Sequence, residues 1–381
     1  MLPPLSLYVH IPWCVQKCPY CDFNSHAQKG IIPEREYITH LLQDLDQDLE
    51  RYQDSVNGRK LHSIFIGGGT PSLFSAESIA FLLQQIRQRI DFSHNIEITL
   101  EANPSTVEAK RFLAYAKAGI TRISMGIQSF DDQKLQALGR IHNAQEAKTA
   151  VKIAKESGLN SFNLDLMHGL PNQTVQQALA DLQQAIDLDP PHLSWYQLTI
   201  EPNTLFAYRP PILPDDDALW DIFEQGHQLL TAAGYHQYET SAYAKAGFQC
   251  QHNLNYWRFG DYLAIGCGAH GKLSFPNGEI IRFSKTKHPR GYLRGEYLYE
   301  QKNVNILDRG FEFFMNRFRL LEPVPKQDFV QLTGLPLTSI QTEMAWALEQ
   351  GYIQENETSW QITQQGKLFL NDLLARFLPD E

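Results

Sequence analysis

Residues 5–21 read LSLYVHIPWCVQKCPYC, an apolar run of strand length followed at once by three cysteines. These are Cys14, Cys18 and Cys21, and the next cysteine along the chain is Cys250. A cubane 4Fe-4S cluster has four irons, so three thiolates from one loop leave one iron open to a chelating small molecule. The spacing therefore predicts a cluster with one reactive iron just beyond a β-strand.

Zinc and unliganded thiols are the competing interpretations of this loop. Structural zinc needs a closed set of four ligands, and only His10 and His26 lie near enough to complete one. Cysteines that act as small hydrophobic residues need neither this clustering nor the turn-forming Pro12 and Pro19 beside them. A disulfide would leave one thiol over. We favour the iron-sulfur cluster over these alternatives.

The composition is that of a globular protein with room for one large domain and a smaller one. The chain has 381 residues, 43% of them hydrophobic, and a formal net charge of -10, which argues against a nucleic-acid partner. No window is apolar for long enough to span a bilayer, and the first residues do not resemble a signal peptide. We expect a cytoplasmic protein in which Cys250 and Cys267 are packing residues.

Strand-like and helix-like segments alternate along the first half of the chain. Near-continuous apolar strands separated by helices are typical of a parallel sheet built from βαβ units, and six such units predict a partly closed α/β barrel. The predicted strands cover residues 5–11, 62–67, 96–101, 122–128, 161–167 and 192–200, and the predicted helices cover 33–52, 75–91, 106–118, an interrupted 131–157, and 173–187.

Polar or glycine-rich residues follow the predicted strands. In parallel α/β barrels the functional groups gather where strands end, so these positions are expected on one rim with the cysteine loop. They are the Gly-Gly-Gly-Thr-Pro loop at 67–71, Glu101, Gln128, Asp165 and the Gly-Leu-Pro turn at 169–171. A triple glycine lets the backbone approach a ligand closely, although a tight turn explains it equally well.

These motifs resemble the radical S-adenosylmethionine (SAM) proteins, in the branch that contains oxygen-independent coproporphyrinogen III oxidase and the HemW-type haem chaperones. The resemblance rests on the cysteine loop, on the glycine loop, and on the segments YVHIP (8–12), LGRIH (138–142) and DLMHGLP (165–171). It covers nearly the whole chain. It implies a partial (β/α)6 barrel of the TIM-like radical SAM type, a 4Fe-4S cluster on Cys14, Cys18 and Cys21, and SAM on the open iron.

The family pattern also implies roles for individual residues. Gly68, Gly69 and Thr70 would receive the methionine amino group, Tyr8 would lie on the adenine side, and Glu101 would hydrogen-bond the ribose. Tyr20 is a further expected cofactor contact. Gln128, Arg140 and Asp165 match positions that in the oxidase contact a second SAM molecule, and whether a second SAM binds here is left open.

Three features favour the haem chaperones over the oxidase. The oxidase has an additional cysteine where this chain has Phe23, and it has an N-terminal extension ahead of the barrel. The sequence HNLNYW at 252–257 matches the H-N-x-x-Y-W signature of the chaperone branch. Histidine is the commonest protein ligand to haem iron, so His252 is the expected haem ligand, with Tyr256 and Trp257 beside the porphyrin.

The resemblance therefore implies a haem chaperone that uses the cluster and SAM and delivers haem to acceptor haemoproteins, which we place in the respiratory apparatus. The alternative function is oxidative decarboxylation of coproporphyrinogen III by radical SAM chemistry. The sequence does not decide whether SAM is turned over, whether the chain forms a homodimer, or whether it contacts a membrane through its acceptor.

The pattern changes near residue 304 to helices joined by short loops. Helix, helix, short hairpin and helix predict a small, mainly helical, winged-helix-like domain. Its 337–350 helix has no Lys or Arg, which argues against DNA binding and favours a lid or docking role. We predict a barrel core at 1–235, a barrel extension with the H-N-x-x-Y-W motif at 236–303, and a C-terminal domain at 304–381.

Overall fold

The computed structural model describes residues 2–27 and 30–378. Its main sheet has twelve strands in the order β14-β13-β12-β11-β1-β4-β5-β6-β7-β8-β10-β9. Six strands in the middle of this order are parallel neighbours that follow one another along the chain, which confirms the predicted α/β fold. These six are β1 (Leu5–Ile11), β4 (Leu61–Gly68), β5 (Phe92–Ala102), β6 (Arg122–Gln128), β7 (Ser161–His168) and β8 (His192–Gln197).

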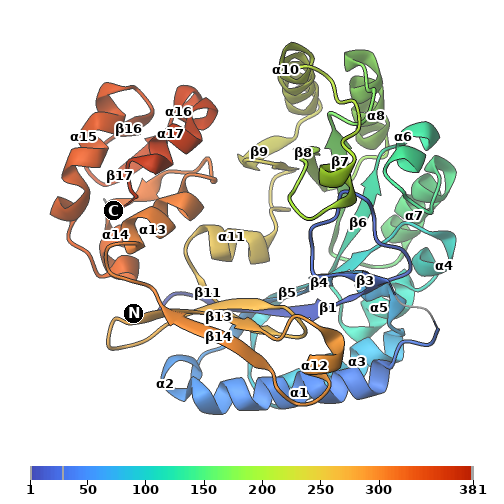
Figure 1. Cartoon of the computed structure of the whole chain (residues 1–381), viewed down its shortest axis with the longest axis horizontal. Helices are drawn as coiled ribbons and strands as arrows, with labels where there is room; N and C mark the ends of the chain where they lie inside the picture. Colours follow the sequence, from blue (N-terminus) through green and yellow to red (C-terminus); the bar gives the residue numbers. More distant parts are fainter. Residues whose placement is uncertain (1, 28–29, 379–381) are drawn as a thin grey trace.

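Helices cover the outer face of the parallel strands (Figure 1). Asn143 with Glu146, and Thr174 with Gln177, form capping boxes that begin two of these helices, because each pair satisfies backbone N–H groups of the first turn. The outer helices are α1 (Glu34–Arg51), α2 (Gln53–Val56), α3 (Ala76–Arg87), α4 (Thr106–Ala109), α5 (Phe112–Ala118), α6 (Asp132–Ala137), α7 (Ala144–Glu156), α8 (Val175–Asp187) and α10 (Asp216–Ala232). The predicted 106–118 helix is thus two helices, α4 and α5.

The segment after α10 supplies both edges of the sheet. One edge has β9 (His236–Glu239) and β10 (Ala242–Ala244), which are antiparallel. The other has β11 (Asp261–Ile265), parallel to β1, and the antiparallel β12 (His270–Ser274), β13 (Ile280–Lys285) and β14 (Leu298–Asn303). Within the described residues the pairings run from β14 to β9 without joining these two end strands, so the barrel is partial.

The two faces of the parallel strands differ in polarity. Leucine, isoleucine and valine residues of the strands are buried with the helices in the main core. Alternate residues on the other face are polar: Ser124 of β6 donates to Asp165 of β7, and Asn163 bonds Asp165 and His192. Because successive side chains of a strand point to opposite faces, the barrel interior is polar although each strand looks apolar in the sequence.

A short helix, α11 (Gln251–Trp257), contacts β1, β4 and β11 and also the C-terminal helix α13 (Arg309–Arg317). Figure 1 shows α11 in the middle of the molecule, between the sheet and the C-terminal domain. The H-N-x-x-Y-W motif forms nearly the whole of this helix. The motif therefore lies where the two parts of the molecule meet.

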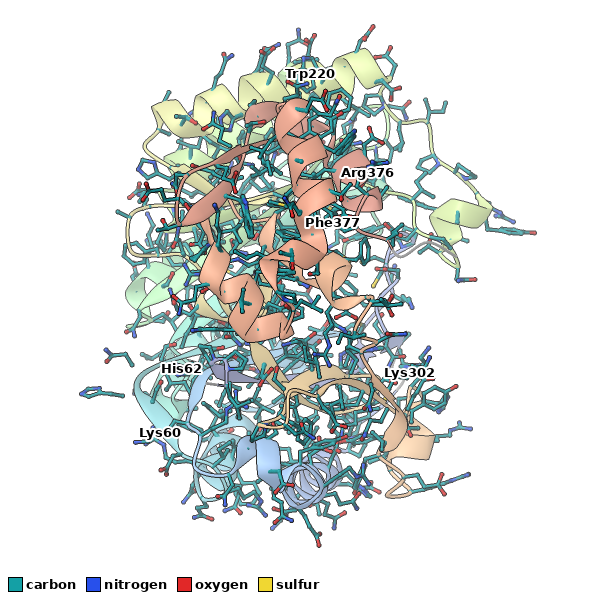
Figure 2. The ribbon with its side chains drawn as sticks, turned by 90° about the vertical axis from the view of Figure 1, so that its left-hand side faces the viewer. Lys60, His62, Trp220, Lys302, Arg376 and Phe377 are labelled. Atoms are coloured by element: carbon teal, nitrogen blue, oxygen red, sulfur yellow. The ribbon has the colours of Figure 1, made fainter. Side chains whose placement is uncertain are left out.

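The C-terminal domain has its own aromatic core, built around Phe314, Phe329 and Trp360. Figure 2 views the molecule from the side of this domain, where Arg376 and Phe377 are labelled. Its other elements are β15 (Val324–Pro325), α14 (Lys326–Thr333), a 3-10 turn (Leu337–Ile340), α15 (Gln341–Glu349), β16 (Ile353–Glu355), β17 (Ser359–Ile362), α16 (Gln364–Leu368) and α17 (Leu370–Ala375). The predicted helices at 337–350 and at the C-terminus are therefore each divided in two.

Candidate functional site

One cavity of about 820 Å³ opens between the ends of the parallel strands and α11. Its lining includes the three loop cysteines, Tyr20, Gly68, Gly69, Thr70, Glu101, Gln128, Arg140 and Asp165, all of which the sequence analysis named. Of the residues predicted to contact the cluster, SAM or haem iron, Tyr8 and His252 do not line it. The barrel topology therefore gathers most of the predicted site from segments far apart in the chain.

The cysteine loop leaves β1 and is fixed by a short parallel pairing of β2 (Trp13–Cys14) with β3 (His26–Ala27). Cys14, Cys18 and Cys21 are free thiols, and a turn bond from the Cys21 N–H to the Cys18 carbonyl orders the loop. No group of three or more His, Cys, Asp or Glu side chains in the described part of the chain converges on a single metal ion. In a 4Fe-4S cluster each of the three thiolates would bind a different iron.

The two histidines that could complete a zinc site are already engaged. His10 contacts the Tyr8 hydroxyl through Nδ1 at 3.0 Å and the Asn24 carbonyl through Nε2 at 2.9 Å. His26 Nε2 lies 3.3 Å from the Asn24 side-chain oxygen. These contacts favour the iron-sulfur interpretation of the cysteine loop.

The glycine loop is joined directly to the cysteine loop. The Gly69 N–H donates to Ile11 O at 2.7 Å and the Thr70 N–H donates to Trp13 O at 2.8 Å. A Cβ on Gly69 would lie 2.5 Å from Trp13 O, and one on Gly68, whose φ is +115°, would meet the His10 ring at 2.5 Å. Close packing of the two loops therefore requires glycine at both positions.

Glu101 ends β5 beside the glycine loop and accepts the Gly68 N–H at 3.0 Å. Burial raises the pKa of the Glu101 carboxyl to about 8, Asp165 adds to the rise, and the Gly68 amide opposes it. Burial also raises the pKa of Asp165, against hydrogen bonds from Asn163, Ser194 and Ser124. Two partly buried acids thus face a cavity in which a cationic ligand would favour their ionised forms.

Arg140 links the cysteine loop to the inner strands. Its Nη2 donates to Asn103 Oδ1 and to Gly126 O, both at 2.8 Å, and its Nη1 lies 3.6 Å from Cys18 Sγ. Gln128, with φ +68°, accepts a hydrogen bond from the Tyr196 hydroxyl at 3.0 Å. No role was predicted for Asn103 or Tyr196, although Asn103 follows the predicted strand 96–101 and Tyr196 lies within the predicted strand 192–200.

His252 is only 5% exposed and belongs to a chain of polar groups inside the barrel. Its Nδ1 lies 2.9 Å from Ser63 Oγ, which donates to Ser6 Oγ at 2.8 Å, and Asn255 Nδ2 also donates to Ser6 Oγ. Since the Ser63 proton is used on Ser6, Ser63 accepts from His252, which places the ring proton on Nδ1. Burial, with a contribution from Arg122, lowers the His252 pKa to about 3, so the ring is neutral.

Glu97 of β5 holds the start of α11. Its two carboxylate oxygens accept the N–H groups of Gln251 at 3.1 Å and of His252 at 3.0 Å. Tyr256 and Trp257, one turn further along α11, line the cavity. No role was predicted from the sequence for Ser6, Ser63 or Glu97. The one sign of their importance there is that each is a polar residue within an apolar strand.

Comparison with known proteins gives two family matches. The sequence family described as the radical SAM superfamily matches residues 8–185, and the family described as the HemN C-terminal domain matches residues 306–369. The protein named heme chaperone HemW of Haemophilus influenzae is 77% identical over 380 residues, covering 100% of this chain and 99% of that protein. The chain belongs to the HemW family. A second member, heme chaperone HemW of Escherichia coli, is 64% identical and covers 100% of this chain and 99% of its own length.

HemW membership confirms the predicted family and implies a 4Fe-4S cluster and SAM through the radical SAM superfamily. The structure of the radical SAM enzyme coproporphyrinogen III oxidase (HemN) from Escherichia coli superposes with a TM-score of 0.82 at 22% identity, over 99% of this chain and 90% of that one. This likeness confirms the fold. No helix in the described residues is long and apolar enough to cross a membrane.

Proposed function

We propose that this protein binds haem in the cavity beside α11 and delivers it to acceptor haemoproteins. The observation that carries the proposal is that Tyr256 and Trp257 of the H-N-x-x-Y-W helix line the same cavity as the three cysteines. Its volume of about 820 Å³ lies in the range of small-molecule sites. The HemW relatives, named heme chaperones, support the same function.

The residues present fit the cofactors that the family implies. Cys14, Cys18 and Cys21 would hold the cluster, and the glycine loop with Glu101 would hold SAM against the open iron. When bound, the two groups supply one-electron chemistry at a carbon–sulfur bond. The protein positions both loops by backbone hydrogen bonds and places the Glu101 and Asp165 carboxyls nearby.

We propose His252 as a haem ligand. A neutral ring with its proton on Nδ1 leaves the Nε2 lone pair for iron, and metal-bound histidines commonly donate their other N–H in this way. The ring is buried against Phe65, at a centroid distance of 5.1 Å, and beside Tyr256. Ligation by His252 therefore requires Tyr256 to move and open a path from the cavity.

The test is a haem titration of the full-length protein after anaerobic reconstitution with iron and sulfide. We expect stoichiometric binding that His252→Ala weakens. His62→Ala is the matched control, because His62 is an exposed histidine on the same strand as Ser63 (Figure 2).

A parallel incubation with coproporphyrinogen III, SAM and a reductant tests the alternative function. Decarboxylated product formed equally by wild type and His252→Ala would overturn the chaperone proposal and identify an oxidase. Haem binding without such product supports the proposal.

A further inference from the structure

The cavity has a cationic end that belongs to the C-terminal domain. Arg319 follows α13 and lines the cavity. Beside it in the lining are Glu239 at the end of β9, Ser241 of the β9–β10 turn, and Tyr256 and Trp257 of α11. The other arginine in the lining is Arg140, beside the cysteine loop. The cavity thus runs from a predicted metal cluster to an arginine contributed by a separate domain.

The backbone around Arg319 is fastened to the barrel. The Thr240 N–H donates to Arg319 O at 3.0 Å, and the Leu321 N–H donates to Tyr238 O at 3.1 Å. Between them, Glu239 and Leu320 form an isolated antiparallel bridge. Arg319 is therefore held in position from both sides, and its side chain is presented to the cavity from a fixed point.

The Arg319 guanidinium lies over the Trp257 ring, with Cζ 4.7 Å from the ring centroid. Its Nε is buried without a hydrogen-bond partner, and among the described residues the guanidinium forms no hydrogen bond or ion pair; the Thr240 hydroxyl donates to the Arg319 carbonyl, not to its side chain. Arg140, by contrast, donates to Asn103 and Gly126. Buried donors of native proteins are normally paired, so the unpaired Nε of Arg319 marks a donor that a ligand could use.

Arginine presents its donors as a planar fork that matches a carboxylate bidentately, and guanidinium groups stack well on aromatic faces. Haem is a flat tetrapyrrole with two propionate carboxylates. An acidic chain, with a net charge of -10, needs a local cation to hold such a ligand. Arg319 over Trp257 combines that cation with an aromatic face.

We propose that Arg319 is the carboxylate subsite of this cavity: it binds a propionate of the porphyrin while Trp257 and Tyr256 contact the macrocycle. The inference rests on the proposed function and adds the residue that recognises the acid groups of the cargo. Because Arg319 belongs to the C-terminal domain and α11 to the barrel extension, a bound porphyrin bridges the two parts of the molecule.

The nearby Glu239 carboxyl does not oppose this assignment. Burial raises its pKa, while the Ser241 amide, Arg319 and Trp257 partly offset the rise. A raised pKa widens the pH range over which this carboxyl is neutral and does not repel an incoming carboxylate. Arg319 and Glu239 form no ion pair, so the ligand does not have to displace one.

The experiment compares two ligands on three full-length, cluster-reconstituted proteins. The ligands are metal-free protoporphyrin IX and its dimethyl ester, which lacks the carboxylates, and binding is followed by porphyrin fluorescence so that iron ligation plays no part. The proteins are wild type, Arg319→Gln and Arg258→Gln. Arg258 is the matched control, because its fork is already occupied by Glu322 at 2.7 and 2.6 Å and it lies outside the cavity.

We expect Arg319→Gln to weaken binding of the free acid about ten- to a hundredfold, as for loss of a hydrogen bond to a charged group. Wild type and Arg258→Gln should bind the dimethyl ester more weakly than the free acid by a similar factor, whereas Arg319→Gln should bind the two ligands almost equally. Arg319→Lys should recover part of the discrimination, and it serves as the test if the glutamine variant does not fold.

If Arg319→Gln still distinguishes the acid from the ester as wild type does, the assignment of Arg319 is overturned while the chaperone proposal stands. If wild type binds neither haem nor either porphyrin, the proposed function itself is overturned. The two failures are therefore separable in one set of titrations.

Discussion

Lys285 of β13 is a buried cation whose removal should destabilise the barrel strongly. Its Nζ lies 2.6 Å from Asp44 Oδ1 and 2.7 Å from Asp48 Oδ1, and the three side chains are 0–1% exposed. The other oxygen of Asp44 accepts the Gly266 N–H and the Tyr292 hydroxyl. This cluster joins α1 to the β11–β14 edge of the sheet.

Replacing Lys285 by Met leaves two buried carboxylates without their cation. Removing one partner of a buried ion pair typically costs about 3–5 kcal/mol, and we expect a loss of unfolding free energy of that size at pH 8. Burial already raises the pKa of Asp44, and that of Asp48 to about 7, against the opposing effect of Lys285.

The contribution of these carboxyls to the unfolding free energy falls as pH rises. A carboxyl with a folded-state pKa above its unfolded value contributes stability below the unfolded pKa and loses it as pH rises through the folded pKa. For Asp48 that window runs from about 4 to about 7 in wild type. Without Lys285 both pKa values rise further, so the difference between variant and wild type should be larger at pH 8 than at pH 5.5.

The assay is equilibrium urea unfolding of both proteins at the two pH values. Lys302→Met is the control, because Lys302 pairs with Glu300 at 2.8 Å but is 71% exposed and lies at the outer surface (Figure 2). An exposed pair contributes little, so this variant should unfold as wild type does. If Lys285→Met lowers the free energy of unfolding by less than about 1 kcal/mol at pH 8, the buried ion cluster does not stabilise the fold as argued.

Three further predictions concern the cavity. Cys18→Ser should bind less iron per protein after reconstitution, whereas Cys267→Ser, which lies outside the cavity, should bind as much as wild type. Equal iron content in the two variants would contradict the cluster assignment. SAM carries a positively charged sulfonium, so the affinity of the protein for SAM should rise with pH as Glu101 ionises near pH 8. Calorimetric titration should find no such pH dependence in Glu101→Gln. If the pH dependence persists in that variant, another group is responsible for it. Gly69→Ala should destabilise the protein by about 1–3 kcal/mol through its contact with Trp13 O, measured by thermal unfolding, and an unchanged midpoint would show that the loops can separate.

Much of the fold, and the gathering of most candidate site residues in one cavity, could be predicted because the signals are local. The strand-helix period of the first half of the chain specifies a parallel sheet, and the ends of parallel strands must share one rim. The cysteine and glycine loops are each contained in a few residues. Helix breaks such as that between α4 and α5 were not predicted, because they depend on how each turn packs on the sheet.

The part of the cavity beside α11, where we propose that haem binds, shows what only the tertiary structure decides. The sequence names His252 as a ligand, but the fold buries it, assigns its proton through Ser63, and brings Tyr256 and Trp257 into the cavity instead. His252 and Ser63 lie 189 residues apart, and no local pattern pairs them. Arg319 reaches Trp257 because the C-terminal domain docks on the β9–β10 turn. Spacing along the chain specifies elements and loops, whereas the partners of a buried polar group depend on contacts between distant segments, which only the folded chain brings together.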